Sequence, residues 1–240
     1  MRLYRLLSFV NWKYAVGEFL LIVMGIVVAL AVNSWYANQQ LRGVEIRYLQ
    51  RIRTSLAADL EGVSESQAAI EEAVARLHRL KAHLASRAPY SESLNELFSE
   101  LTRWRGVTLK TSIYESLRAR GLDLISNEEM QVELIEVYEN VNDRLSQQNA
   151  NNRELSLNEI IPYQAQHFSQ DGGRYVPYDY QALLDDRHYL SLIDLKTNGY
   201  ETFTLPAYRA AAEDIRRLIT LIDTELSNAD RLALAELGHS

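Results

Sequence analysis

The sequence contains no cysteine and little proline or glycine, with four prolines and ten glycines among 240 residues. The absence of cysteine excludes disulfide bonds, thiolate zinc sites and cysteine nucleophiles. Few helix-breaking residues, together with abundant Leu, Ala, Glu and Arg, indicate an all-α protein. The chain also lacks a block of basic residues, and its net charge is −7. This acidic balance argues against nucleic acid as a partner.

The sequence also lacks the motifs that carry common catalytic and cofactor chemistry. It contains no glycine-rich phosphate loop, no Gly-x-Ser-x-Gly elbow and no calcium-loop spacing. Acid pairs such as Glu71-Glu72 and Asp185-Asp186 are sequence neighbours, which point to different sides of a helix. His78 and His83 lie five residues apart, whereas a zinc pair on a helix prefers a spacing of four. We therefore expect a protein that is not an enzyme and that holds no metal and no cofactor.

One stretch is too apolar to remain in water: residues 14–32, YAVGEFLLIVMGIVVALAV. Nineteen residues at about 1.5 Å each form a helix of roughly 28 Å, which matches one hydrocarbon core of a bilayer. We predict a single transmembrane helix over residues 14–36. A cleaved signal peptide is the alternative, because basic residues precede the run and Ala29-Leu30-Ala31 resembles a cleavage site. We favour the anchor, since no helix breaker precedes that site and Glu18 would interrupt the apolar part of a signal.

One side of this helix combines a charged residue with small residues. At 100° per residue, Glu18, Ile22, Gly25 and Ala29 fall on one face. The small-xxx-small pair Gly25-x-x-x-Ala29 allows two helix backbones to approach closely in lipid. Glu18 would then point at a partner helix instead of lipid. We predict that this face associates with another helix; the alternative is that Glu18 reaches the headgroups and the small residues are incidental.

Basic residues are nearly balanced across the apolar run: Arg2, Arg5 and Lys13 precede it, and Arg42, Arg47, Arg51 and Arg53 follow it. The second group begins further from the run, so the positive-inside rule slightly favours a cytoplasmic N-terminus. This orientation puts the large C-terminal part outside the cytoplasm, in the periplasm if the source is bacterial.

The rest of the chain has the length of one domain and shows helical apolar periodicity. Apolar residues recur every seven positions at Leu49, Leu56, Val63, Ile70, Leu77 and Leu84. This seam predicts a long helix to about Ser86, packed in a bundle or a coiled coil. Capping boxes at residues 112–115 and 126–129 predict two helix starts, and Gly121 predicts a helix end. Further helices are expected from residue 130 to the neighbourhood of Pro162, over residues 180–196, and from Pro206 onward.

These elements divide the chain into four predicted parts. They are a short N-terminal tail over residues 1–13, the transmembrane helix over 14–36, a bundle of about four or five helices over 37–228, and a frayed tail over 229–240. Asp171-Gly172-Gly173 marks a break, and an irregular loop is expected around Pro177.

Three stretches together resemble an uncharacterised family of bacterial single-pass membrane proteins, catalogued as a domain of unknown function. They are VGEFLLIVMGIVVALAVNSW at residues 16–35, the positions Tyr114, Leu117, Gly121, Ile125, Asn127 and Tyr138, and LITLIDTEL at residues 218–226. The resemblance implies a helical architecture and an address in the bacterial inner membrane. It implies no activity and supplies no catalytic residue.

Tyrosine is the one compositional excess. The chain has fourteen, and Tyr175, Tyr178 and Tyr180 lie close together around Pro177. Tyrosine clusters suit recognition surfaces, because each side chain offers a large area and a hydroxyl at a small entropic cost. The alternative is that these tyrosines fill the end of the bundle and cover its core.

The sequence therefore predicts a non-enzymatic, membrane-anchored interaction protein. It would self-associate, or serve as an accessory subunit of a membrane complex, through the face of Glu18, Gly25 and Ala29. Its partners would be the lipid bilayer and either a second copy or another membrane protein. The second hypothesis is an extracytoplasmic ligand-sensing bundle with Tyr175 and its neighbours near the pocket, although only about thirteen residues precede the anchor. The third is an enzyme that uses scattered acidic residues.

Overall fold

The computed structural model describes residues 12–237, and the surroundings of the side chains of residues 16–231. The structure is 84% helical, which confirms the predicted all-α class. The chain divides into two compact units, with the boundary between Arg47 and Tyr48. The predicted N-terminal tail, residues 1–13, lies almost wholly outside the described residues.

The first unit contains the beginning of helix α1 (Trp12–Ala85). The most apolar window of this helix has a mean hydropathy of 2.3, and none of that window is buried. By length and composition this part of α1 is able to cross a membrane. The helix continues without a break into the predicted heptad seam, so no loop separates the apolar segment from the seam.

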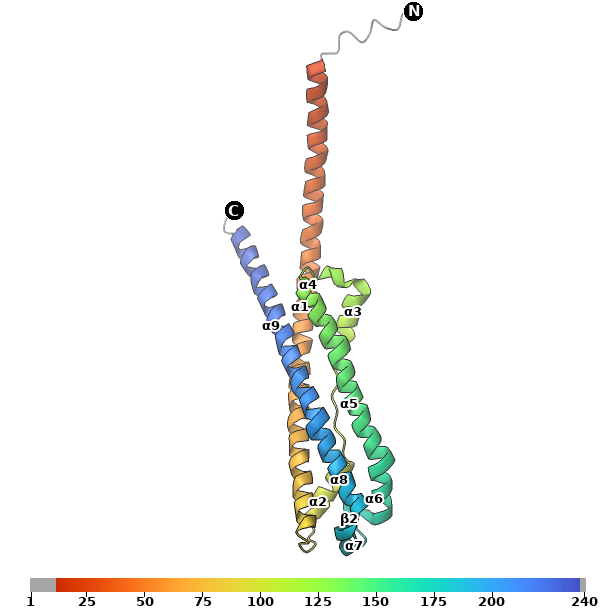
Figure 1. Ribbon diagram of the computed structural model, residues 1–240. Helices are drawn as coiled ribbons and strands as arrows, with labels where there is room; N and C mark the ends of the chain where they lie inside the picture. The colour runs from red at the N-terminus through yellow and green to blue at the C-terminus, as the bar shows by residue number, and fades with distance from the viewer. Residues whose placement is uncertain (1–11, 238–240) are drawn as a thin grey trace, which may run out of the picture. The chain divides into compact units, whose positions relative to one another are not determined.

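The second unit is built on three long helical runs that lie side by side (Figure 1). The first is α1 from Tyr48 onward. The second consists of α4 (Glu128–Ile135), a π-helical turn (Glu136–Val141), α5 (Asn142–Leu155), a second π-helical turn (Ser156–Ile160) and α6 (Ile161–His167). The third consists of α8 (Arg187–Gly199), a π-helical turn (Tyr200–Thr204) and α9 (Leu205–Leu237).

Ion pairs show that α1 and the third run are antiparallel. Arg53 contacts Asp223 at 3.0 Å, and Glu71 contacts Arg209 at 3.0 Å, so residue numbers rise on one helix as they fall on the other. These pairs are exposed and contribute little to stability. The free energy that holds the helices together comes from the apolar side chains between them.

The predicted heptad seam of α1 is its buried stripe, which confirms this part of the sequence analysis. Each member is at most 1% exposed: Leu49, Leu56, Val63, Ile70, Leu77 and Leu84. Ile215, Leu218 and Ile222 form the corresponding buried stripe of α9. Burial of a side chain of this size contributes about 1.5–3 kcal/mol, so these stripes account for much of the cohesion of the bundle.

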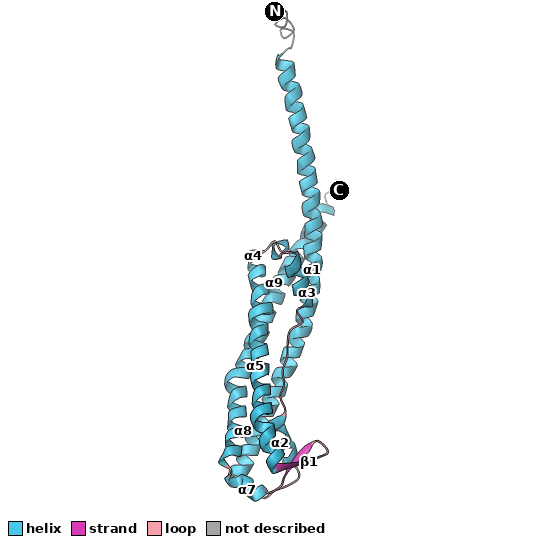
Figure 2. Cartoon of the chain, turned by 90° about the vertical axis from the view of Figure 1, so that its right-hand side faces the viewer, coloured by secondary structure: helices cyan, strands magenta, loops and turns pink. Residues whose placement is uncertain are grey.

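The remaining elements of the described chain are short. They are α2 (Leu94–Thr102), α3 (Ser112–Arg120), a 3₁₀ turn (Leu122–Leu124), α7 (Tyr180–Asp185), and an antiparallel hairpin of β1 (Phe168–Asp171) and β2 (Arg174–Pro177) (Figure 2). The hairpin occupies the place where the sequence predicted an irregular loop, so that prediction was wrong. Its loop, Gly172-Gly173, has φ values of 55° and 80°, which glycine adopts without strain and which two-residue hairpins favour.

An extended segment, Arg103–Thr111, connects α2 to α3; we call it the strap. It runs along the length of the bundle, in the place that a fourth long helix takes in a four-helix bundle (Figure 1). From Arg103 to Lys110 an extended chain covers about 23 Å, whereas a helix of the same residues would cover only about 11 Å. The α1 residues at its two ends, Arg76 and Asp59, are about 26 Å apart along their helix. The chain is therefore extended because it must return along the bundle in few residues.

The predicted helix end at Gly121 is confirmed, and the two predicted capping boxes each differ from the structure by one residue. Helix α3 begins at Ser112, but its N-cap is Thr111, which makes no side-chain hydrogen bond to the helix. Gly121 closes the helix at a φ of 108°, a backbone conformation that favours glycine. Helix α4 is capped by Asn127, whose side chain accepts a hydrogen bond from the Met130 N–H at 3.1 Å. The predicted cap at Ser126 was therefore wrong by one residue.

Of the two helix boundaries predicted near prolines, the end near Pro162 is wrong, whereas α9 begins at Leu205, close to the predicted start at Pro206, although it directly follows a π-helical turn. The second run continues through Pro162 to His167, and the third continues through Pro206. Each proline follows a π-helical turn by two residues. Proline clashes with the carbonyl four residues before it, and a π-helical turn replaces the i→i−4 pattern at that point with a wider one. The helical run therefore bulges and continues at each proline.

Two further boundaries differ from the predictions. The helix expected over residues 180–196 is divided into α7 and α8, because Asp186 caps α8 by accepting hydrogen bonds from the N–H groups of His188 and Tyr189. Helix α9 extends to Leu237, so residues 229–237 are helical, whereas a frayed tail was predicted there.

Candidate functional site

The four residues of the predicted association face, Glu18, Ile22, Gly25 and Ala29, are all exposed on α1. Ile22 is 57% exposed. A Cβ atom added at Gly25 meets no other atom within 4 Å. Because α1 is unbroken here, the helical spacing keeps the four residues on one face, with room for another helix backbone.

The three tyrosines proposed as a recognition surface lie in different surroundings. Tyr180 is buried, and its hydroxyl donates to the Ala88 carbonyl at 2.7 Å. Tyr175 is half-buried on β2, and its N–H donates to Ser99 Oγ at 3.0 Å. Tyr178 is 67% exposed. The structure therefore does not bring the three side chains together on one surface.

Other aromatic residues fill this end of the bundle. Tyr163 and Tyr189 stack with ring centroids 5.4 Å apart, and Phe98 meets Phe168 edge-on at 5.3 Å. Tyr189 is fully buried, and burial raises the pKa of its hydroxyl. Aromatic packing of this kind is typical of a core. Many of the tyrosines at this end are therefore core residues, as the alternative interpretation of the tyrosine cluster expects.

Side chains hold the strap in place. Within the described part of the chain, no backbone–backbone hydrogen bond involves residues 104–110. Instead, the Val107 N–H donates to Tyr208 Oη at 3.2 Å, and the Val107 carbonyl accepts from Asn149 Nδ2 at 2.7 Å. A Cβ atom added at Gly106 would lie 2.6 Å from the Asn149 side chain. A larger residue at position 106 would therefore displace the Asn149 side chain from its hydrogen bond to the strap.

The end of the strap near α3 is held in the same way. The Leu109 N–H donates to Asn142 Oδ1 at 3.0 Å, and the Lys110 N–H donates to the Asp59 carboxylate at 3.3 Å. Burial raises the pKa of Asp59, and the Lys110 N–H acts in the opposite direction. Residues of α1, α5 and α9 thus bind the strap backbone, much as a groove binds an extended peptide.

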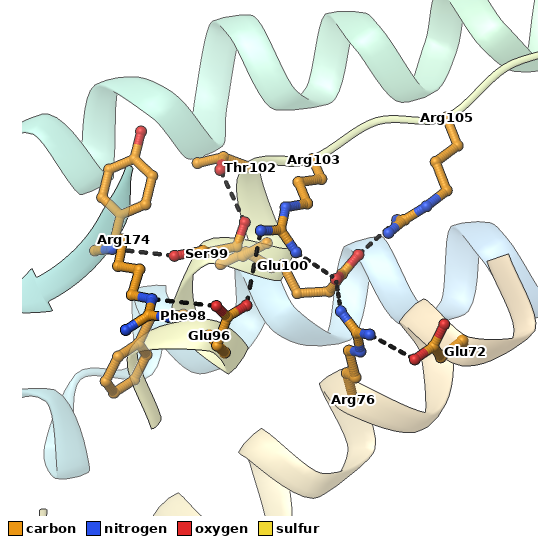
Figure 3. Close-up of polar contacts among 12 residues, drawn as sticks. Glu72, Arg76, Glu96, Phe98, Ser99, Glu100, Thr102, Arg103, Arg105 and Arg174 are labelled. Atoms are coloured by element: carbon orange, nitrogen blue, oxygen red, sulfur yellow. Dashed lines mark hydrogen bonds and ion pairs between the residues drawn. The ribbon is translucent and has the colours of Figure 1, made fainter. Parts of the chain in front are cut away.

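The other end of the strap is fixed by a buried carboxylate (Figure 3). The Glu100 side chain is fully buried, and it contacts Arg105 at 2.5 Å, Arg76 at 3.2 Å and Arg103 at 3.4 Å. Two of these guanidinium groups belong to the strap and one to α1. An unpaired buried charge would cost several kcal/mol, so the three arginines offset the cost of burying the Glu100 carboxylate.

The ion pairs continue from Glu100 in both directions (Figure 3). Arg76 also contacts Glu72 at 2.5 Å. On the other side, Arg103 contacts Glu96 at 3.7 Å, and Arg174 Nε donates to Glu96 at 3.2 Å. The network therefore connects the β-hairpin, α2, the strap and α1.

Lys196 is a second buried charged group beside the strap. It is 1% exposed, and its Nζ donates to the Leu101 carbonyl at 2.8 Å, the Arg103 carbonyl at 2.6 Å and Ser156 Oγ at 2.9 Å. Burial lowers the pKa of Lys196 to about 7, and the Glu100 carboxylate opposes that shift. These contacts join the end of α2 to the π-helical turn that contains Ser156.

The sequence analysis did not identify the strap, Glu100 or Lys196. A signal for the strap exists, because its inward positions Val107 and Leu109 alternate with exposed ones, a period of two that is typical of extended chain. Glu100 and Lys196 give no such signal. A single charged residue in an amphipathic helix has the same sequence pattern whether it faces solvent or a buried partner.

A cavity of about 390 Å³ lies between the start of α2 and the turn of the β-hairpin. It is lined by Tyr90, Glu92, Asn95, Asp171, Gly172, Arg174 and Val176. Tyr175, Tyr178 and Tyr180 do not line it. Two of its lining residues, Arg174 and Val176, are sequence neighbours of Tyr175. The lining includes the carboxylates of Glu92 and Asp171 and the guanidinium group of Arg174.

The histidines His78 and His83 of α1 take unrelated partners. His78 Nε2 lies 2.9 Å from Glu201, and His83 Nε2 lies 3.2 Å from the Pro89 carbonyl. Among the described residues, no group of three or more His, Cys, Asp or Glu side chains is arranged to hold a metal ion.

No family model, no curated protein and no solved structure matches the chain.

Proposed function

We propose that this chain is a non-enzymatic, membrane-anchored interaction protein. In this proposal the apolar part of α1 crosses the membrane, and the face of Glu18, Ile22, Gly25 and Ala29 binds a second helix. That helix belongs either to another copy of the chain or to a membrane complex of which the chain is an accessory subunit. The observation that carries the proposal is the combination of a carboxylate and small residues on one uncovered helical face.

The energetics of a bilayer favour a partner at this face. A carboxyl group in the hydrocarbon region is costly unless another group or water solvates it. Gly25 leaves enough space for a neighbouring backbone to pack closely, and close packing is the main source of helix association in lipid. A partner helix would satisfy both conditions at once.

The proposed location is the bacterial inner membrane, with the helical bundle in the periplasm. The motif resemblance supports the bacterial address, and the distribution of basic residues supports the orientation. Fusion of a periplasm-dependent reporter to the C-terminus tests the orientation directly. Activity of a cytoplasm-dependent reporter at the same position would reverse it.

The experiment that tests the association face is crosslinking of the full chain in native membranes, compared with a Gly25→Ile variant. The large side chain would hold the two backbones apart, so the crosslinked species should be lost. Val27→Ile is the matched control, because it adds bulk at a position about 160° away on the same helix. A Gly25→Ile variant that crosslinks as well as the wild type would exclude this face.

Affinity purification in a mild detergent distinguishes the two kinds of partner. A homo-oligomer yields the tagged and untagged copies of this chain together, whereas an accessory subunit yields a second membrane protein in fixed proportion. In either case, Gly25→Ile should remove the co-purifying protein and Val27→Ile should retain it. Co-purification that survives Gly25→Ile would place the interface elsewhere.

A further inference from the structure

The cavity beside the β-hairpin is lined by charged groups of both signs. Glu92 and Asp171 form no ion pair among the described residues. Arg174 donates its Nε to Glu96 at 3.2 Å. Its two terminal nitrogens have no hydrogen-bond partner within the described chain. The cavity therefore offers acceptors on two carboxylates and donors on one guanidinium group.

Asn95 supplies a buried polar group to the same cavity. It is 8% exposed and lines the cavity wall. Its side-chain oxygen accepts a hydrogen bond from the Tyr90 hydroxyl at 2.9 Å. The other end of the amide has no partner among the residues that the structure describes. Asn95 Nδ2 is not one of the fully buried polar atoms that lack a partner in the described chain, so this donor is accessible to solvent and to a bound molecule.

We propose that the cavity binds a small zwitterion that carries an ammonium and a carboxylate group, of the chemical class of a free amino acid. The ammonium group would contact Glu92 and Asp171, and the carboxylate would contact Arg174 and the Asn95 amide. Tyr90 and Val176 provide apolar surface for the rest of the molecule. A volume of about 390 Å³ lies within the usual range of small-molecule sites.

The mixture of charges favours a zwitterion over a simple ion. A cation would meet the Arg174 guanidinium, and an anion would meet two carboxylates. A molecule with both charges pairs each one with an opposite charge in the cavity, and Arg–carboxylate pairs are among the stronger polar contacts in proteins. Arg174 also belongs to the ion-pair network of Figure 3, so a ligand held by Arg174 would be connected to Glu96 and, through it, to the strap.

The test is isothermal titration of the full-length chain in detergent with each proteinogenic amino acid, with putrescine as a cation and with acetate as an anion. We expect at least one amino acid to bind in the micromolar to millimolar range, with no comparable heat from putrescine or acetate. Arg174→Gln should weaken binding at least tenfold, and Arg187→Gln, an exposed arginine outside the cavity, should not. Helical circular dichroism confirms that each variant is folded.

Glu92→Gln serves as a second variant, because Glu92 is exposed and its substitution does not disturb the ion-pair network. It should also weaken amino-acid binding. The proposal is overturned if no amino acid binds, if Arg174→Gln binds as well as the wild type, or if putrescine or acetate binds with equal affinity. Gly25→Ile should leave the titration unchanged, so this result is independent of the association face.

Discussion

Tyr208 on α9 donates its hydroxyl proton to Asn149 Oδ1 on α5 at 3.0 Å, and the two side chains together bind both peptide groups of Val107. The phenol accepts the Val107 N–H, and the amide donates to the Val107 carbonyl. Every polar group in this arrangement has a partner. The strap is therefore bound to two helices at a point where the described residues give it no backbone partner.

Replacement of Asn149 by alanine should lower the free energy of unfolding by about 1–3 kcal/mol, because it leaves the Val107 carbonyl without its donor. Urea denaturation of the chain in detergent, followed by circular dichroism, measures the change. Asn151→Ala is the matched control: it lies on the same helix, is exposed, and should change stability by less than about 0.5 kcal/mol. Equal effects of the two substitutions would show that the strap is not held by Asn149.

Glu100→Gln should be strongly destabilising, by about 3–5 kcal/mol, because three guanidinium groups would then surround a neutral buried amide. Glu72→Gln provides the control, since its side chain is 63% exposed and contacts only the outer side of Arg76. It should cost less than about 1 kcal/mol. The same denaturation experiment compares them, and a small effect of Glu100→Gln would mean that the buried charge does not organise the arginines.

Lys196 should make stability depend on pH. Its pKa falls from 10.5 to about 7 on folding, so the unfolded chain binds more protons between these values. The free energy of unfolding should therefore rise with pH above 7, by up to about 1.4 kcal/mol per pH unit. Burial raises the pKa of several tyrosines, and these groups act in the opposite direction near pH 10. Measurements between pH 7 and 9 isolate the lysine.

Lys196→Met tests the assignment of this pH dependence. The variant has no amine to titrate, so its unfolding free energy should be nearly flat over the same pH range. Arg187→Gln removes an exposed cation instead and should leave the slope unchanged. A slope that survives in Lys196→Met would assign the pH dependence to another group.

Two glycines should respond in opposite directions to alanine. Gly121 has a φ of 108°, and an added Cβ would lie 2.2 Å from an Asp123 oxygen, so Gly121→Ala should destabilise the chain by more than about 1 kcal/mol. Gly199 is helical, and an added Cβ there meets no atom within 4 Å. Gly199→Ala should therefore stabilise the chain by about 0.5–1 kcal/mol. Thermal unfolding of both variants checks the signs, and the same sign for both would contradict the backbone argument.

The periodic features of the fold were predictable, and the polar ones were not. The Leu49-to-Leu84 seam follows from a spacing of seven, because side chains that repeat at that interval must share a helical face. The helix end near Pro162 was predicted incorrectly, and the continuity of the helical run before Pro206 was missed, because a proline has the same local sequence whether the chain breaks or a π-helical turn precedes it. Which of these occurs depends on whether packing on both sides stabilises the continued helix.

For the candidate sites, the sequence supplied the face of Glu18, Ile22, Gly25 and Ala29, since helical spacing alone places them together. It did not supply the cavity beside the hairpin. Asn95 and Arg174 are far apart in the chain, and only the docking of the β-hairpin on α2 brings them to one cavity. The tyrosines illustrate the same limit, because composition revealed their number but not that Tyr180 is buried and Tyr178 exposed.

By itself, the sequence determined a long apolar helix near the N-terminus, an all-α class and the buried seam of α1. These follow from local spacing and from the cost of leaving apolar surface in water. The tertiary structure decided the path of the strap, the burial of Glu100 and Lys196, and the cavity at the hairpin. These depend on partners distant in sequence, and the free energy of a buried charge or an extended segment is set by those partners.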